Sequence, residues 1–302
     1  MEVNRNQRGG GGAELKTAIA LKLHSYGLMQ LHDPNWTGME LFDRLKQHTR
    51  GREQPTTMLF KPLRKGLLYH LGLWLYRDYF ISDTHRMSLG SEYRLWYLED
   101  LLELLKAANV PANDDRIAEA TSLVEKIDAL YGTDEKKYWR ALDRDTVYEA
   151  TDALIVKYEN KLLPLSGAYA ENYAERVFHD RQLCEHISKT LVAIGFDGRP
   201  DWIGPPRQWI GRLNTWPRWV VDAVVSRDRG LCARCGVSLT SELRAPKHID
   251  HIIALANAGT NDLSNLQLLC DACNLNKSKR MIDVRSSIPS YLQLAREERA
   301  KD

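Results

Sequence analysis

The chain has 302 residues, 43% of them hydrophobic and 27% charged, which is typical of a folded globular protein and excludes a disordered or fibrous one. No stretch approaches the roughly 18 uninterrupted apolar residues of a membrane span, because the best candidate, residues 66–80, contains His70, Arg77 and Asp78. The first residues lack the apolar segment of a signal peptide, so we expect a cytoplasmic protein. Five cysteines are too few for a disulfide scaffold, and we expect them to remain thiols.

The formal net charge of +2 is unevenly distributed along the chain. Residues 195–302 contain 16 Lys and Arg against 12 Asp and Glu, whereas the preceding residues contain 26 against 28. This asymmetry favours a nucleic-acid contact surface in the C-terminal part, although charge alone does not establish it.

The first two thirds of the chain have a helical pattern. Residues 1–12, with four consecutive glycines, predict a disordered tail. In residues 13–195, leucine and aromatic residues recur at spacings of three and four, which predicts a bundle-like helical domain that regulates the protein or binds DNA or a partner. Asn113 and Thr133 precede acidic residues and are expected as helix N-caps.

Residues 196–217 are rich in Gly, Pro and Trp and predict a connector between two domains. The tryptophans either pack the connector against its neighbours or, together with Arg207 and Arg212, form a surface that stacks on exposed bases. A helix is predicted over residues 218–227, at the start of a second domain that covers residues 218–302.

Four of the five cysteines form two C-x2-C pairs, Cys232 with Cys235 and Cys270 with Cys273. Each pair directs two thiolates at one ion, and two such pairs complete a tetrahedral zinc site. Since the protein fills all four positions, we expect a structural zinc that contributes folding free energy to a small domain. Redox or buried thiols are the alternative, and Cys184 is expected to be a core residue.

Between the two cysteine pairs, the sequence predicts a strand that ends near Ile253, a loop in which Gly259 permits an unusual backbone angle, and a second short strand. A helix follows over residues 271–281. A strand, loop, strand and helix joined by zinc make a ββα-metal unit. The expected fold class is therefore mainly α, with a large N-terminal helical domain and a small C-terminal zinc-stabilised ββα-metal domain.

Residues 216–280 resemble the HNH endonuclease family in its zinc-ribbon form. The resemblance rests on the cysteine pairs together with Asp250, His251, Asn265, Asn274 and Lys277. It implies a metal-dependent phosphodiesterase that acts on nucleic acid, usually DNA, with His251 as the general base. In the family, the asparagine at the position of Asn265 fixes the loop and orients the base.

Hydrolysis of a phosphodiester also needs charge relief on the phosphate and on the leaving oxygen, which a hard divalent cation supplies. Asp250 and Asn274 offer oxygen ligands for Mg²⁺ or Mn²⁺. Many family members have histidine where this chain has Asn274, and the change favours these harder ions over softer transition metals. Lys277, one turn after Asn274, is expected to hold a phosphate.

Alternatives exist for several of these residues. Asn265 is also a common turn residue, and Asn274 a common helix-start residue. Lys277, Lys279 and Arg280 form a basic run that either contacts phosphates or is only a solvated face. His248 shares a strand face with Asp250 and is an additional candidate contact for metal or substrate.

Two classes of function remain open from the sequence: a nuclease, or a zinc-stabilised nucleic-acid-binding protein without catalysis. A single site cuts one strand per binding event, so a monomer is expected to nick DNA. A helical region ahead of such a domain resembles the layout of bacterial anti-phage defence nucleases, including the HNH component of type II Zorya systems. This resemblance implies that the helical domain binds other proteins of a defence system. Restriction, mobile-element and toxin nucleases stay open as alternatives.

Overall fold

The computed structural model describes residues 57–82, 91–142, 145–193, 210–240 and 246–277. Contacts between these residues divide the chain into two compact units. Unit 1 contains residues 72–173, and unit 2 contains residues 30–71 and 174–302, each with the gaps given above. The predicted tail and most of the predicted connector lie outside the described residues, so the predicted domain boundaries stay predictions.

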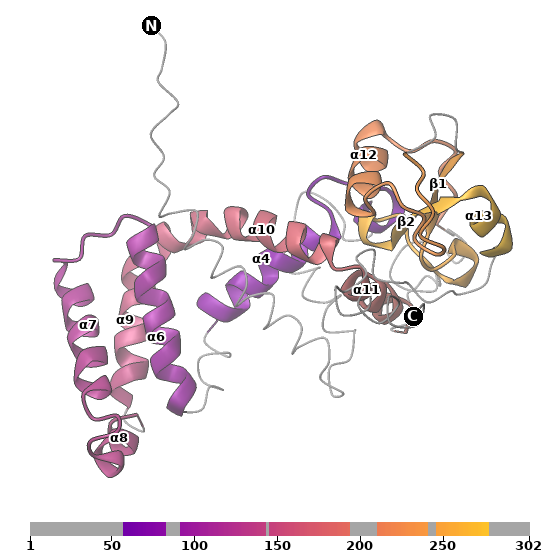
Figure 1. Ribbon diagram of the computed structural model, residues 1–302. Helices are drawn as coiled ribbons and strands as arrows, with labels where there is room; N and C mark the ends of the chain where they lie inside the picture. The colour runs from indigo at the N-terminus through magenta and orange to yellow at the C-terminus, as the bar shows by residue number, and fades with distance from the viewer. Residues whose placement is uncertain (1–56, 83–90, 143–144, 194–209, 241–245, 278–302) are drawn as a thin grey trace, which may run out of the picture. The chain divides into compact units, whose positions relative to one another are not determined.

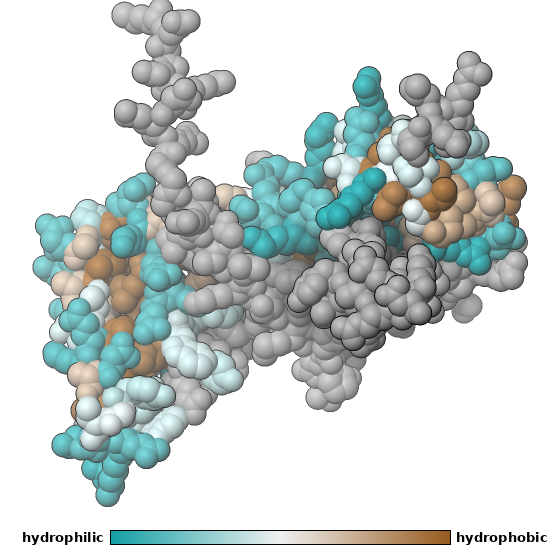
Figure 2. All heavy atoms as spheres, in the orientation of Figure 1, coloured by the Kyte–Doolittle hydropathy of each residue, from teal (hydrophilic) through white to brown (hydrophobic). Residues whose placement is uncertain are grey.

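Unit 1 is built on three helices that pack lengthwise, α6 (Ser91–Ala107), α7 (Asp115–Asp128) and α9 (Asp145–Leu162), with the short α8 (Glu135–Leu142) at one end (Figure 1). Apolar side chains lie between rows of hydrophilic ones on this bundle (Figure 2). This is the pattern expected of helices that bury one face. Leu98 and Leu101 of α6 and Val147 of α9 are completely buried.

Two helices in unit 1 begin one residue later than the sequence predicts. Asp114, not Asn113, is the N-cap of α7, and its carboxylate accepts a hydrogen bond from the Arg116 N–H. Asp134 accepts a bond from the Lys137 N–H at the start of α8. A carboxylate is favoured at this position because it satisfies a free backbone donor and faces the positive end of the helix dipole.

The boundary between the units falls within α4 (Leu67–Phe80) and α10 (Ser166–His179). Within unit 1 these helices approach closely, since a Cβ atom at Gly72 would lie 2.9 Å from the Cα of Ala170. Aromatic side chains fill the neighbouring core, where the rings of Tyr76 and Tyr169 stack with centroids 5.2 Å apart. The Tyr76 hydroxyl donates to the carbonyl of Leu162.

Unit 2 contains a two-stranded antiparallel sheet of β1 (Lys247–His251) and β2 (Leu266–Cys270), in which Asp250 pairs with Gln267 and His251 with Leu266. α12 (Arg218–Arg227) packs on β2, and α13 (Asp271–Lys277) packs on both strands. α11 (Arg181–Ala193) packs on η3 (Leu263–Asn265), the 3-10 turn before β2. α3 (Thr57–Phe60) belongs to the same unit, although it precedes the sheet by almost 200 residues.

The expected fold class is confirmed: the described chain is mainly helical, with a small strand–loop–strand–helix unit in its C-terminal part. The sequence predicts that Gly259 adopts an unusual backbone angle, and this prediction was wrong. Gly259 has no positive φ, and it is Ala258 that adopts the left-handed conformation, with φ 63°. Glycine is required at 259 because a Cβ atom there would overlap the carbonyl oxygen of Ile253.

Candidate active site and metal centre

The four cysteines of the two C-x2-C pairs form one cluster. Their sulfur atoms lie within 4.8 Å of one another, and the Sγ atoms of Cys235 and Cys270 are 3.8 Å apart. A tetrahedron with Zn–S bonds of about 2.3 Å has edges of about 3.8 Å, so the cluster fits a four-thiolate zinc ion. The fifth cysteine, Cys184, is completely buried and its thiol contacts the carbonyl of Val177, as expected for a core residue.

Neighbouring residues of β1 point to opposite sides of the sheet, which separates the surroundings of Asp250 from those of His251. Asp250 faces α13, where its Oδ2 lies 2.9 Å from the Nζ of Lys277. The ring of His251 is 8% exposed, faces the loop of residues 252–265, and lies 5.6 Å from the ring of Trp216.

Asn261 determines which nitrogen of His251 carries a proton. Its Nδ2 donates to two backbone carbonyls, those of Phe60 at 2.8 Å and Gly211 at 2.9 Å. Because a carbonyl only accepts, the other end of the Asn261 amide must be the oxygen, and this oxygen lies 2.8 Å from the Nε2 of His251. A neutral His251 therefore carries its proton on Nε2 and has a free lone pair on Nδ1.

Burial of the ring lowers the pKa of His251 below its ordinary value. The hydrogen bond to Asn261 and the charge of Asp250 raise the pKa and oppose this effect, whereas the positive charges of Lys277 and Arg212 lower it further. The ring is therefore neutral near pH 7, as a general base must be.

Asn265 joins the two ends of the loop between β1 and β2. Its Oδ1 accepts from the Ile253 N–H at 2.9 Å, and its Nδ2 donates to the carbonyls of Ile253 at 3.0 Å and Thr260 at 2.8 Å. The side chain is completely buried with every hydrogen-bonding group used. Asn265 thus fixes the loop that carries Asn261, which is the role that the family resemblance implies for it.

The predicted oxygen ligands for a divalent cation come from β1 and α13. Asp250 supplies a carboxylate, and Asn274 lies three residues before Lys277 and hence on the same helix face. One carboxylate with an amide oxygen suits Mg²⁺, which keeps several waters or phosphate oxygens as further ligands. Lys277 itself is 1% exposed and pairs with Asp250, so the structure places it against the carboxylate rather than at the surface.

A buried charge network connects α11 and α12 with β2. The guanidinium of Arg227 donates to both carboxylate oxygens of Asp228 and to the carbonyl of Leu266. Asp228 also accepts from the Leu268 N–H at 2.8 Å, and the Nε of Arg181 lies 3.6 Å from its Oδ1. Asp228 thus positions β2, and through its pairing β1, against helices far away in the sequence.

The remaining predicted contacts are only partly described. Arg212 is exposed and follows Gly211, whose carbonyl receives the Asn261 hydrogen bond. His248 lies 3.1 Å from Asp271 on the same side of β1 as Asp250. Arg207, Lys279 and Arg280 lie outside the described residues.

The part of unit 2 that contains this site matches a known protein family. Residues 232–280 match the family described as HNH endonuclease. The match contains both cysteine pairs, β1, the loop, β2 and α13, so unit 2 carries an HNH domain. No curated protein and no solved structure matches the chain.

The HNH domain indicates metal-dependent nuclease activity, and hence a nucleic acid as substrate. Within the described part of the chain, every helix is too short or too polar to cross a bilayer.

Sequence reasoning missed Asn261 and its backbone partners. Asn261 is an ordinary loop residue in the sequence, and its carbonyl partner on Phe60 lies 201 residues earlier. Only Asn261's place in the loop between the strands could have drawn attention to it, and no local pattern connects it with α3.

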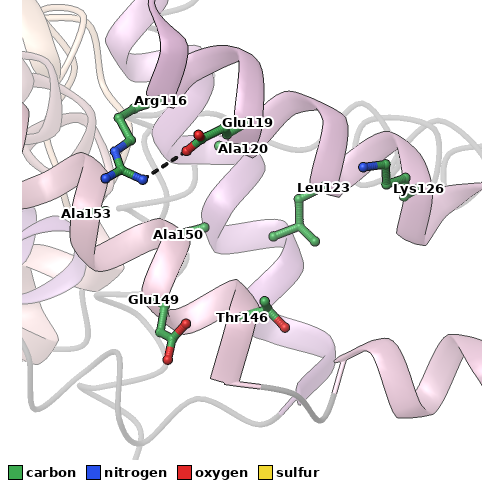
Figure 3. A pocket seen from close by; sticks show the side chains of 9 residues that line it. All are labelled: Arg116, Glu119, Ala120, Leu123, Lys126, Thr146, Glu149, Ala150 and Ala153. Atoms are coloured by element: carbon green, nitrogen blue, oxygen red, sulfur yellow. Dashed lines mark hydrogen bonds and ion pairs between the residues drawn. The ribbon is translucent and has the colours of Figure 1, made fainter.

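A groove of about 340 Å³ in unit 1, between α7 and α9, has a different character (Figure 3). Ala120, Ala150 and Leu123 form its inner surface, and an exposed Arg116–Glu119 ion pair lies at its edge. Its carboxylates, Glu119 and Glu149, belong to no group of three or more potential metal ligands, and among the described residues the one such group is the cysteine cluster of unit 2.

Proposed function

We propose that the protein is a metal-dependent DNA endonuclease in which His251 is the general base. The hydrogen-bonded chain from Phe60 and Gly211 through Asn261 to His251 carries this proposal, because it holds a buried imidazole with a lone pair on Nδ1. A protein that only bound DNA would have no need of such a base.

In this mechanism the Nδ1 of His251 accepts a proton from a water molecule that attacks the phosphorus atom. The Nε2 proton stays in its bond to Asn261, which stabilises the charge on the ring as it becomes protonated. Asp250 and Asn274 would hold a magnesium or manganese ion, which would supply charge relief to the phosphate and to the leaving oxygen. Lys277 keeps the Asp250 carboxylate in place. The four cysteines would hold a zinc ion that joins the strands to α13.

The experiment is a plasmid-cleavage assay with Mg²⁺ that compares the wild type with His251→Ala. The loss of a positioned base should lower the rate by about 10²- to 10⁴-fold. His179→Ala is the matched control, since His179 lies in the same unit and is half exposed, with its Nε2 3.0 Å from a carboxylate oxygen of Glu175. Failure of the wild type to cut DNA with either Mg²⁺ or Mn²⁺ would contradict the proposal and favour a DNA-binding protein without catalysis.

One site cuts one strand, so we propose that the protein is a nickase. Supercoiled plasmid should be converted to the nicked form before linear DNA accumulates. Linear product from the first time point would instead indicate paired sites.

An anti-phage role in the cytoplasm is proposed on the layout alone, a helical region followed by an HNH domain. Bacteria that express the wild type should resist phage infection better than bacteria that express His251→Ala. Equal plaque numbers for both would contradict this role.

A further inference from the structure

A basic turn lies next to the candidate active site. Residues 61–65, here called the basic turn, connect α3 to α4 and contain Lys61, Arg64 and Lys65. All three side chains are exposed, while Pro62 between them is buried and anchors the turn. Residues 57–71 contain no acidic residue, so the charge of the turn is not offset within its own segment.

Two hydrogen bonds from Asn261 hold this turn at the loop that His251 faces. The N–H of Asn261 donates to the carbonyl of Leu59 at 2.8 Å, and its Nδ2 donates to the carbonyl of Phe60. Phe60 directly precedes Lys61, and the same asparagine contacts His251. The basic turn is therefore fixed relative to His251 through one residue, and Figure 1 shows this indigo segment beside α12.

Contacts with aromatic rings orient two of the cations. The guanidinium carbon of Arg64 lies 5.1 Å from the centre of the Trp219 ring at the start of α12. The Nζ of Lys65 lies 4.8 Å from the centre of the Tyr69 ring. Such cation–π contacts orient a side chain, and the contact with Trp219 does not remove the positive charge of Arg64.

A second basic segment reaches the same asparagine. The Gly211 carbonyl receives the other Asn261 hydrogen bond, and the exposed Arg212 follows it. The charge of Arg212 is close enough to His251 to lower its pKa. Asn261 therefore joins two basic segments, which lie far apart in the sequence, around one imidazole.

We propose that the basic turn, together with Arg212, binds the phosphate backbone of the DNA strand that His251 cleaves. This inference rests on the proposed nuclease function and assigns substrate binding to residues 61–65, which lie outside the HNH match. Phosphates on either side of the scissile bond would contact Lys61, Arg64 and Lys65, and these contacts carry no base specificity.

The test measures the affinity of full-length protein for a fluorescent DNA duplex at several salt concentrations. It uses the His251→Ala background, which prevents cleavage. The triple variant Lys61→Gln, Arg64→Gln and Lys65→Gln should bind at least about 10-fold more weakly. The slope of log affinity against log salt should fall by about 2 to 3, since each lost phosphate contact removes about 0.9.

The matched control is a triple variant in α8: Lys136→Gln, Lys137→Gln and Arg140→Gln. It makes the same change in net charge on exposed side chains of unit 1. An unchanged affinity in the basic-turn variant, or an equal loss in the α8 variant, would overturn the inference, since the second result would reflect net charge alone.

Cleavage kinetics separate this inference from the proposed function. With His251 intact, the basic-turn variant should show a raised KM and a kcat within about threefold of the wild type, which also shows that it folds. If the wild type cuts DNA and the basic-turn variant has an unchanged KM, the inference fails while the function stands. If the wild type never cuts, but the variant still weakens DNA binding, the function fails and the binding surface stands.

Discussion

Unit 1 and unit 2 bury different kinds of side chain. The core of unit 1 consists of leucine, tyrosine and other apolar residues, and its described part buries only Asp100, Thr151 and Ser166 among polar residues. The described part of unit 2 buries twelve polar or charged residues, including Asp228, Asn261, Asn265 and Lys277. Burial of polar groups costs free energy unless each is paired.

This difference shows what each unit is built to do. Apolar packing stabilises a helical bundle without requiring a particular proton position or charge. In unit 2, paired amides and charges hold His251 and Asp250 in defined states. Unit 2 should therefore be sensitive to the loss of single polar groups or of zinc, and unit 1 to the loss of apolar volume.

Zinc removal should have the largest effect and should separate the two units. A four-thiolate zinc site contributes on the order of 10 kcal/mol to the folding of a small domain. Chelation, or Cys273→Ser, should abolish zinc binding and expose the amides of β1, β2 and α13, while α6 and α9 stay protected. Hydrogen exchange with mass spectrometry measures both units in one experiment.

Cys184→Ala provides the control, since Cys184 is buried away from the thiolate cluster. It should keep one zinc per chain. Retention of the exchange pattern of unit 2 after complete chelation would contradict a structural role for zinc.

Asp228→Ala should have the next largest effect. It leaves the buried guanidinium groups of Arg227 and Arg181 without their carboxylate, and such uncompensated charges cost about 3–5 kcal/mol. Calorimetry should show a lower unfolding temperature for unit 2. Asp222→Ala, an exposed carboxylate on the same helix α12, should cost less than about 1 kcal/mol.

Leu98→Ala tests the same difference between the two units with a substitution in unit 1. Leu98 is completely buried in α6, and truncation of such a leucine costs about 2–5 kcal/mol. Its effect should appear in the exchange of unit 1 and leave zinc content unchanged. Equal loosening of both units by Leu98→Ala and Asp228→Ala would contradict the division proposed here.

Asn261→Ala should have the smallest effect on stability and a clear effect on cleavage. It leaves the carbonyls of Phe60 and Gly211 unpaired, at a cost of about 1–3 kcal/mol. Since His251 then loses its tether, the cleavage rate should fall by about 10- to 100-fold, measured under single turnover at saturating DNA. A wild-type rate in this variant would show that the tether is not needed.

The sequence predicts those parts of unit 2 that depend on local patterns. The cysteine spacing predicts the cluster, and α12 spans the predicted residues 218–227. The first strand ends at His251 rather than near Ile253, because the backbone of Ile252 and Ile253 turns to bond with Asn265. Apolar character alone does not show where such a turn begins.

Contacts between distant segments could not be predicted. The role of Asn261 depends on α3, and the role of Asp228 depends on burial beneath α11, neither of which leaves a local pattern. Lys277 belongs to a basic run that is typical of a solvated surface, yet its side chain packs inward against Asp250. A single sequence predicts which residues share a helix face with Lys277, but it does not predict that Asp250 packs against this face.

The tautomer of His251 tests the central claim most directly, because the proposed mechanism requires Nδ1 to accept the proton. Nitrogen-15 NMR of histidine-labelled protein at neutral pH, with His251→Ala to assign the signal, reports which ring nitrogen carries hydrogen. We predict a neutral ring protonated at Nε2, and loss of that preference in Asn261→Ala. A His251 protonated at Nδ1, or at both nitrogens, would contradict the account.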